Sequence, residues 1–82
     1  MVTSQSIKNH IETSMPCDLV QVEGDDGSHF NAVIVSAEFR GKNRVRQHQL
    51  VYQALGDRMK AEIHALSMKT LTPEEWAESN GT

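Results

Sequence analysis

Four histidines and one cysteine are the side chains of this 82-residue chain best suited to binding a metal. His29 follows a turn rich in glycine and aspartate, and His64 lies within an apolar segment. If the two imidazoles met at one edge of a sheet, they would supply half of the coordination shell of zinc or iron. The remaining positions would be left for the ligands of a second molecule. A strand histidine packed in the core and a solvated turn histidine remain the plainer alternatives.

The other candidate ligands are weaker. His10 is expected on the exposed side of a helix, and His48 precedes Tyr52 by one turn, so that it borders either the core or a basic surface. Cys17 has no His, Lys or second Cys beside it to lower its pKa, which favours a small packed side chain over a redox thiol. A lone cysteine excludes an internal disulfide framework and a zinc site built on Cys pairs, and it fits a reducing compartment.

A basic segment, residues 40–46, holds four cations (Arg40, Lys42, Arg44 and Arg46) and interrupts an otherwise acidic chain. Residues 1–39 sum to −5, residues 40–60 to +5 and residues 61–82 to −3, counting Lys and Arg against Asp and Glu. Cations before a helix attract phosphates, but without interleaved aromatic side chains they are more typical of a solvated face or a docking surface for an acidic protein. The predicted partner-binding or nucleic-acid-binding residues are Arg40, Lys42, Asn43, Arg44, Arg46 and His48.

No enzyme is expected. Folding 82 residues buries roughly 60% of the unfolded chain's surface, which leaves little room for an enclosed active-site cleft. The sequence has no Ser/His/Asp nucleophile pattern and no phosphate-binding loop. Residues 24–27 (GDDG) match the GxxG that clamps nucleic acid in KH domains, but they carry two acids and separate two predicted strands. They are interpreted as a turn.

The elements that position these side chains follow from apolar periodicity and from capping residues. Because Val45, Tyr52 and Met59 recur at spacing seven, with Val51 and Leu55 filling the same stripe, the second helix should face the core along these residues, with a bend or fraying near Gly56. The predicted elements are a helix over 4–14 capped by Thr3 or Ser4, a strand around 19–22, a turn at 24–28, a strand over 29–38, a helix over 44–59 capped by Asn43, a strand over 62–69, and a short helix opened by a capping box at 72–75 that holds Trp76.

These elements form one α+β domain over residues 1–82, ordered over about 4–78 with a frayed tail at 79–82. The order is α-β-β-α-β-α, with a three-stranded mixed sheet and the helices on one face. A right-handed crossover through the second helix makes the third strand parallel to the second. There is no apolar stretch of about 18 residues and no signal-peptide pattern, so we expect no membrane association and a cytoplasmic protein.

Four segments together resemble the BolA-like protein family, and more closely its IbaG/YrbA branch. The resemblance covers about residues 4–78 and is based on GSHF (27–30), FRGKNRVRQHQLVY (39–52), IHALSMK (63–69) and LTPEEW (71–76). It implies a fold like a class II KH domain. It also implies a cytosolic adaptor that forms a heterodimer with a monothiol glutaredoxin and shares a [2Fe–2S] cluster with it.

In that family picture the glutaredoxin and its glutathione supply thiolates, and this chain supplies imidazoles from His64 and His29. No cofactor is needed for folding. Imidazole in place of thiolate raises the cluster's potential, which suits cluster trafficking or iron and redox sensing in a stress response. The alternative is a DNA-binding transcriptional regulator that uses the basic segment and the following helix, and the acidic pI of 5.7 ranks it second. A metal-free interaction module is the third possibility, and a homodimer is compatible with all three.

Overall fold

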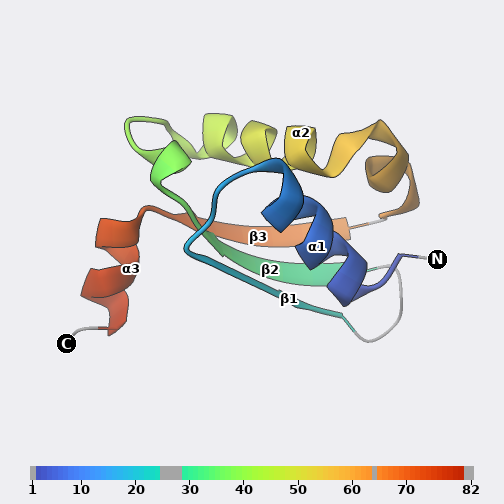
Figure 1. Cartoon of the computed structure of the whole chain (residues 1–82), viewed down its shortest axis with the longest axis horizontal. Helices are drawn as coiled ribbons and strands as arrows, with labels where there is room; N and C mark the ends of the chain where they lie inside the picture. Colours follow the sequence, from blue (N-terminus) through green and yellow to red (C-terminus); the bar gives the residue numbers. More distant parts are fainter. Residues whose placement is uncertain (1, 25–28, 64, 81–82) are drawn as a thin grey trace.

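A computed structural model describes residues 2–24, 29–63 and 65–80, without the side chains of residues 58–60, 62 and 80. The described residues form three α-helices and one three-stranded sheet, with two of the helices on one face of the sheet (Figure 1). The elements in chain order are α1 (Ser4–Ser14), β1 (Leu19–Glu23), β2 (His29–Val35), the short 3-10 helix η1 (Ala37–Phe39), α2 (Arg44–Glu62), β3 (Ala65–Leu71) and α3 (Pro73–Asn80).

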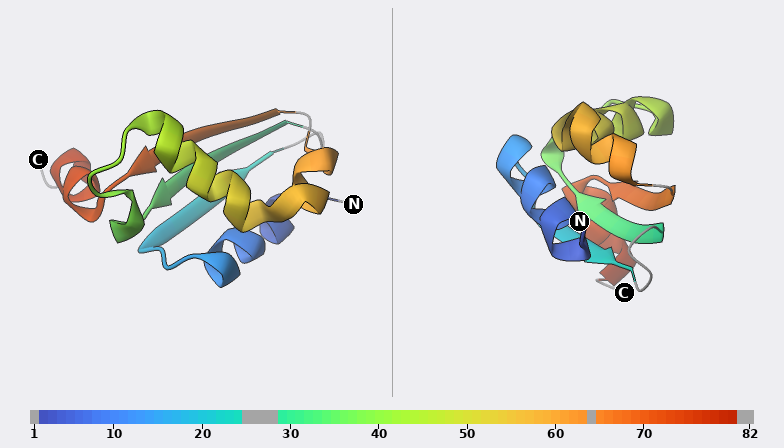
Figure 2. Two further views of the ribbon diagram at one scale, coloured as in Figure 1. Left: turned by 90° about the horizontal axis from the view of Figure 1, so that it is seen from above. Right: turned by 90° about the vertical axis from the view of Figure 1, so that its right-hand side faces the viewer.

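The sheet has the order β1-β2-β3, and it is mixed. β1 pairs antiparallel with β2, and β2 pairs parallel with β3 through α2 as the crossover helix. α1 and α2 lie side by side over one face of the sheet, whereas α3 lies beyond the carboxyl end of β3 (Figure 2). The predicted α+β class, element order and strand directions are thus confirmed.

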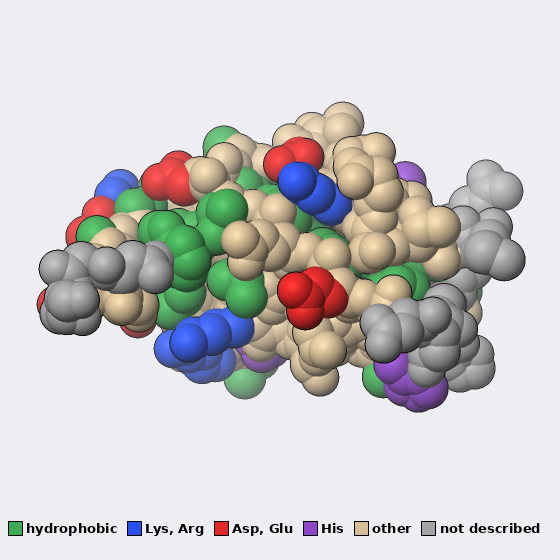
Figure 3. Space-filling model, turned by 90° about the horizontal axis from the view of Figure 1, so that it is seen from below, with side chains coloured by type: hydrophobic (Ala, Val, Ile, Leu, Met, Phe, Trp, Pro, Cys, Tyr) green, Lys and Arg blue, Asp and Glu red, His purple; other side chains and the backbone are tan. Residues whose placement is uncertain are grey.

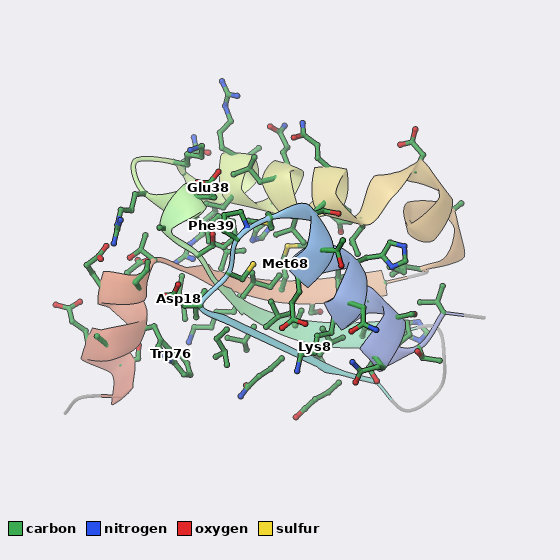
Figure 4. All side chains as sticks on the ribbon, viewed as in Figure 1. Lys8, Asp18, Glu38, Phe39, Met68 and Trp76 are labelled. Carbon is green, nitrogen blue, oxygen red and sulfur yellow. The ribbon has the colours of Figure 1, made fainter. Side chains whose placement is uncertain are left out.

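The core lies between the sheet and the two covering helices. α1 starts where Thr3 accepts the Ser6 N–H at 3.0 Å and Ser6 accepts the Thr3 N–H at 2.9 Å, a reciprocal cap that satisfies two otherwise free donors. Its inward face is apolar, and strand residues 30, 32 and 34 meet it from the sheet. Phe39 is fully buried and lies near Met68 between α2 and the sheet (Figure 4).

The spacing-seven stripe assigned to α2 was wrong in its first turn. Val45 is 66% exposed, whereas Val51 and Leu55 are buried. Positions 47, 51 and 55 share one helix face at i, i+4 and i+8, so the inward residue of the first turn is Gln47. A polar residue occupies the core position of this turn, so the apolar pattern was wrong at Val45, whereas Val51 and Leu55 of the same predicted stripe are buried as expected.

Gln47 is only 5% exposed, and every hydrogen-bonding group of its amide has a partner. Its Nε2 donates to Phe39 O at 3.1 Å and to Lys42 O at 2.9 Å. Its Oε1 accepts from the fully buried Thr70 hydroxyl at 2.7 Å. This amide joins α2, the loop before it and β3 in one network.

Several boundaries differ from those predicted. β2 ends at Val35 rather than at residue 38, because the Ser36 hydroxyl accepts the Glu38 N–H at 3.1 Å and starts η1. α2 continues to residue 62 and β3 runs over 65–71 instead of 62–69, in a parallel register that follows β2 up to the pair Val35–Leu71. Gly56 has φ +80°, so the predicted bend is confirmed.

The chain's last helix is longer than expected. Thr72 and Glu75 form the predicted capping box, with the Thr72 N–H bonded to Glu75 at 2.8 Å. α3 then continues to residue 80, so residues 79 and 80, which were expected in a frayed tail, are helical; residues 81–82 lie outside the described part. None of the described helices has the length and apolar character required to cross a membrane.

Replacing Gln47 with Ala should lower the free energy of unfolding by about 2–3 kcal/mol, because two backbone carbonyls and a buried hydroxyl lose their partner. The matched control is Gln49→Ala, an exposed glutamine on the same helix, which should change it by no more than about 0.5 kcal/mol. Urea unfolding of the three proteins measures both values. Equal stability of the two variants would contradict the structural role of the Gln47 amide.

Candidate functional site

His29 is the first residue of β2, and it is exposed. Strand residues alternate between the two faces of a sheet, and the next residue, Phe30, is 2% exposed and points into the core. His29 therefore lies on the face that α1 and α2 leave open. In Figure 3, which views the molecule from the side opposite α2, histidine side chains show at one end and hydrophobic side chains gather at the other, near α3.

A close backbone approach fixes the chain just before the hairpin turn. A Cβ added to Gly24 would lie 2.4 Å from the Phe30 ring and 2.8 Å from the His29 carbonyl oxygen. No side chain fits at such distances, so glycine lets Phe30 reach the core and sets the backbone position of His29. Residues 25–28, which contain the rest of the predicted turn, lie outside the described residues.

The second predicted ligand, His64, also lies outside the described residues. The structure does place its chain neighbour: Ala65 opens β3 and pairs in register with His29. Adjacent strands are about 4.8 Å apart, so β3 begins directly beside His29. Within residues 2–24, 29–63 and 65–80, no three His, Cys, Asp or Glu residues are grouped so as to hold a metal ion.

The basic segment lies at the far end of the molecule from His29. β2 runs seven residues from His29 to Val35, roughly 20 Å of strand, and the segment follows η1 beyond that end (Figure 1). The longest dimension of the molecule is 37 Å. The structure thus separates the two sets of predicted site residues instead of combining them in one site.

Three of the four cations in this segment are bound within the chain. Arg40 forms a bidentate ion pair with Glu74 of α3 at 2.8 and 2.5 Å, and this hydrogen bonding holds the pKa of Glu74 below its usual value. Lys42 Nζ donates to Glu38 O at 2.9 Å, and the Arg44 guanidinium donates to Thr70 O. Their main observed role is to fasten α2 and α3 to the rest of the chain.

The remaining predicted residues of the segment divide by role. Asn43 is the N-cap of α2, since its Oδ1 accepts the Arg46 N–H at 2.9 Å. The Arg46 side chain is exposed, and within the described part of the chain its guanidinium has no hydrogen-bond or ion-pair partner. His48 is half-buried at the border of the core.

His10 and Cys17 have features that argue against reactive roles. His10 is exposed on α1, with Nδ1 2.9 Å from Ser6 O. Burial, together with Glu12 and Asp18, raises the pKa of Cys17 to about 11. The thiol stays protonated at neutral pH and donates to Met15 O at 3.6 Å, so it is a poor nucleophile and a poor metal ligand there.

The chain is similar to known proteins over nearly its whole length. The family model described as "BolA-like protein" matches residues 2–75. The "DNA-binding transcriptional regulator BolA" of Haemophilus influenzae is 47% identical over 55 residues, which cover 67% of this chain and 53% of that protein. This match therefore spans only about half of the length of the Haemophilus relative.

Two further relatives match over greater shares of their length. "Protein BOLA2" of Arabidopsis thaliana is 35% identical over 80 residues, which cover 93% of this chain and 85% of that protein. The solved structure of a bolA protein homologue from Coxiella burnetii superposes with a TM-score of 0.80 at 47% identity, over 93% of this chain and 97% of that one.

Gly24→Ala should destabilise the fold by about 1–3 kcal/mol, because the added methyl group overlaps the Phe30 ring and the His29 carbonyl. The expected signature is local: amide NMR shifts of residues 29–32 change most. Gly41→Ala is the comparison, since its Cβ meets nothing within 4 Å and only the positive φ of +74° is strained. If Gly24→Ala left the shifts of residues 29–32 unchanged, the proposed positioning of His29 would be wrong.

Proposed function

Because the chain belongs to the BolA-like protein family, we propose that it is a non-enzymatic adaptor that pairs with a monothiol glutaredoxin and shares a [2Fe–2S] cluster with it. The cluster ligands from this chain are His29 and His64. The observation that carries the proposal is the pairing of exposed His29 with Ala65, the residue that follows His64. His29 thus pairs across the two strands with the residue that follows His64 in the chain.

The residues at this edge fit a shared cluster. The exposed His29 lies on a face without a covering helix, so a second protein has access to it. Two imidazoles fill half of the ligand positions of a [2Fe–2S] cluster, and thiolates from the partner complete the set. When bound, the cluster supplies one-electron redox chemistry. Histidine ligation removes negative charge from one iron and raises the reduction potential relative to four thiolates.

The roles of the two histidines differ. The proposal assigns to His64, which directly precedes β3, the ligand position that no other residue of the chain replaces. His29 is exposed, so solvent or another side chain can take its place. Loss of the first ligand should therefore damage the cluster more than loss of the second.

Co-expression with a monothiol glutaredoxin, followed by visible absorption of the purified complex, tests the proposal. His64→Ala should abolish the cluster's distinctive spectrum, and His29→Ala should weaken the cluster more than it weakens the protein complex. His10→Ala, an exposed histidine on α1, is the control and should leave both unchanged. Because His29 is exposed, its replacement should cost about 1 kcal/mol of stability or less. A normal spectrum from His64→Ala would refute the ligand assignment.

The alternative function is DNA binding through the basic segment. The name of the Haemophilus influenzae relative supports it, and the exposed guanidinium of Arg46 is suited to a phosphate contact. Against it, Arg40, Lys42 and Arg44 already donate hydrogen bonds within the chain. A DNA complex would have to compete for them, so this function stays second.

DNA binding makes a quantitative prediction about salt. If Arg46 contacts one phosphate, Arg46→Gln should reduce the slope of log affinity against log salt by about 1 for all duplex sequences. Lys8→Gln, which removes a half-buried cation from α1, outside the basic segment, is the control and should leave the slope unchanged. Submicromolar, sequence-selective binding by the wild-type chain at physiological salt would place DNA binding first.

A further inference from the structure

A groove of about 230 Å³ lies between the end of α1, η1 and the middle of α2. Its lining residues belong to or adjoin α1, η1 and α2, and α1 and α2 cover one face of the sheet, whereas His29 lies on the opposite, open face. Its apolar wall and its rim are provided by Met15, Pro16, Leu50 and Ala54, with Glu38 and Gln53. Figure 4 shows Glu38 on η1, outside the buried Phe39.

The size and packing of the groove select for a protein side chain. Pockets for small molecules and cofactors measure about 300–1,000 Å³, so this groove is smaller and suits one or two inserted side chains. Leu50 and Ala54 are half-buried and pack against the hydrophobic core. The apolar wall is thus preformed, and an apolar side chain loses little by entering it.

A cation lies on the same helix face as the groove. Residues 46, 50 and 53 stand at i, i+4 and i+7 and share one face of α2, which places Arg46 one turn before Leu50. Arg46 is exposed, and among the described residues nothing pairs with its guanidinium. An apolar wall with a cation next to it is complementary to a segment that carries an apolar side chain and a nearby carboxylate.

Nucleic acid fits this surface poorly. Single strands bind by stacking bases on aromatic side chains, and none of the residues that line the groove is aromatic. Glu38 at the rim repels a backbone that carries a negative charge at every phosphate. A protein segment can place a single carboxylate at Arg46 and keep clear of Glu38.

We propose that this groove docks an extended acidic protein segment, with one apolar side chain between α1 and α2 and a carboxylate on Arg46. This goes beyond the shared cluster, because it assigns a second partner to the opposite side of the same chain. The adaptor then holds a second protein at the groove while the edge beside His29 remains accessible.

The test uses a displayed library of random linear peptides selected against the folded chain, so it depends on neither glutaredoxin nor iron. The expected consensus is Leu, Ile or Met with Asp or Glu within about two residues, because one turn of α2 spans about 5.4 Å and an extended chain rises about 3.3 Å per residue. A synthetic peptide of that consensus should shift the amide NMR signals of residues 50, 53 and 54 and leave residue 29 unchanged.

Two variants with matched controls test the groove. Ala54→Met fills it, and Gln53→Glu adds a repelling charge at an exposed rim position that tolerates substitution. Each should weaken peptide binding roughly tenfold, the cost of one lost charged or buried contact. Gln49→Met and Gln49→Glu introduce the same two side chains at an exposed position outside the groove, and these control variants should bind the peptide as wild type does. Selection against Arg46→Gln should lose the acidic preference.

The inference is overturned if no peptide is enriched, if the enriched peptides lack acids, or if Gln53→Glu binds them as well as wild type does. It is also overturned if duplex DNA shifts the same groove amides. Thermal unfolding checks that each variant is folded. If Ala54→Met does not fold, the peptide binding of Gln53→Glu alone decides. The cluster spectrum is measured in a separate experiment. A failed peptide-binding test therefore leaves the glutaredoxin proposal intact, and a failed cluster test leaves the groove proposal intact.

Discussion

The position of every charged group at the start of α2 depends on one buried amide. Gln47 occupies a core position, and burying an amide without partners costs several kcal/mol. Its donors are satisfied only by the carbonyls of Phe39 and Lys42, and its acceptor by the Thr70 hydroxyl. Those three bonds tie the loop before α2 to the carboxyl end of β3. The loop follows a fixed path because the core requires it, and the cations of residues 40–46 are presented by a rigid backbone.

That constraint changes how the positive charge of the chain is interpreted. Arg44 reaches the carbonyl of Thr70, the residue whose side chain bonds to Gln47, and Arg40 joins the same region to α3 through Glu74. An exposed ion pair such as Arg40–Glu74 contributes little to stability, but the two contacts direct both guanidinium groups toward the protein and away from a partner. A count of Lys and Arg therefore overstates the charge available to a partner. Among the four cations of residues 40–46, Arg46 is the one whose side chain has no hydrogen bond or ion pair within the described residues.

The sequence predicted those features that depend on local chemistry. The caps of α1 and α3, the bend at Gly56 and the parallel crossover follow from neighbouring residues or from chain handedness, and the structure confirms them. Gln47 was missed because a polar residue on an apolar stripe shows its role only when Thr70, 23 positions away, is placed beside it. The bounds of β3 were missed for a similar reason, since its parallel register with β2 sets them, whereas β2 ends at the local Ser36 cap. The ligand pair remains a prediction, because His64 lies outside the described residues.

The alternation of β2 gives the molecule two sides with different chemistry. A shift of one residue in register would turn His29 into the core and Phe30 out to solvent. The contact between Gly24 and the Phe30 ring favours the observed register, since the ring fits only where position 24 has no Cβ. His29 is thereby held on the open face, while the apolar groove and Arg46 stay on the helix side. The proposed adaptor role needs this separation, because two partners bound to one small domain must not compete for the same surface.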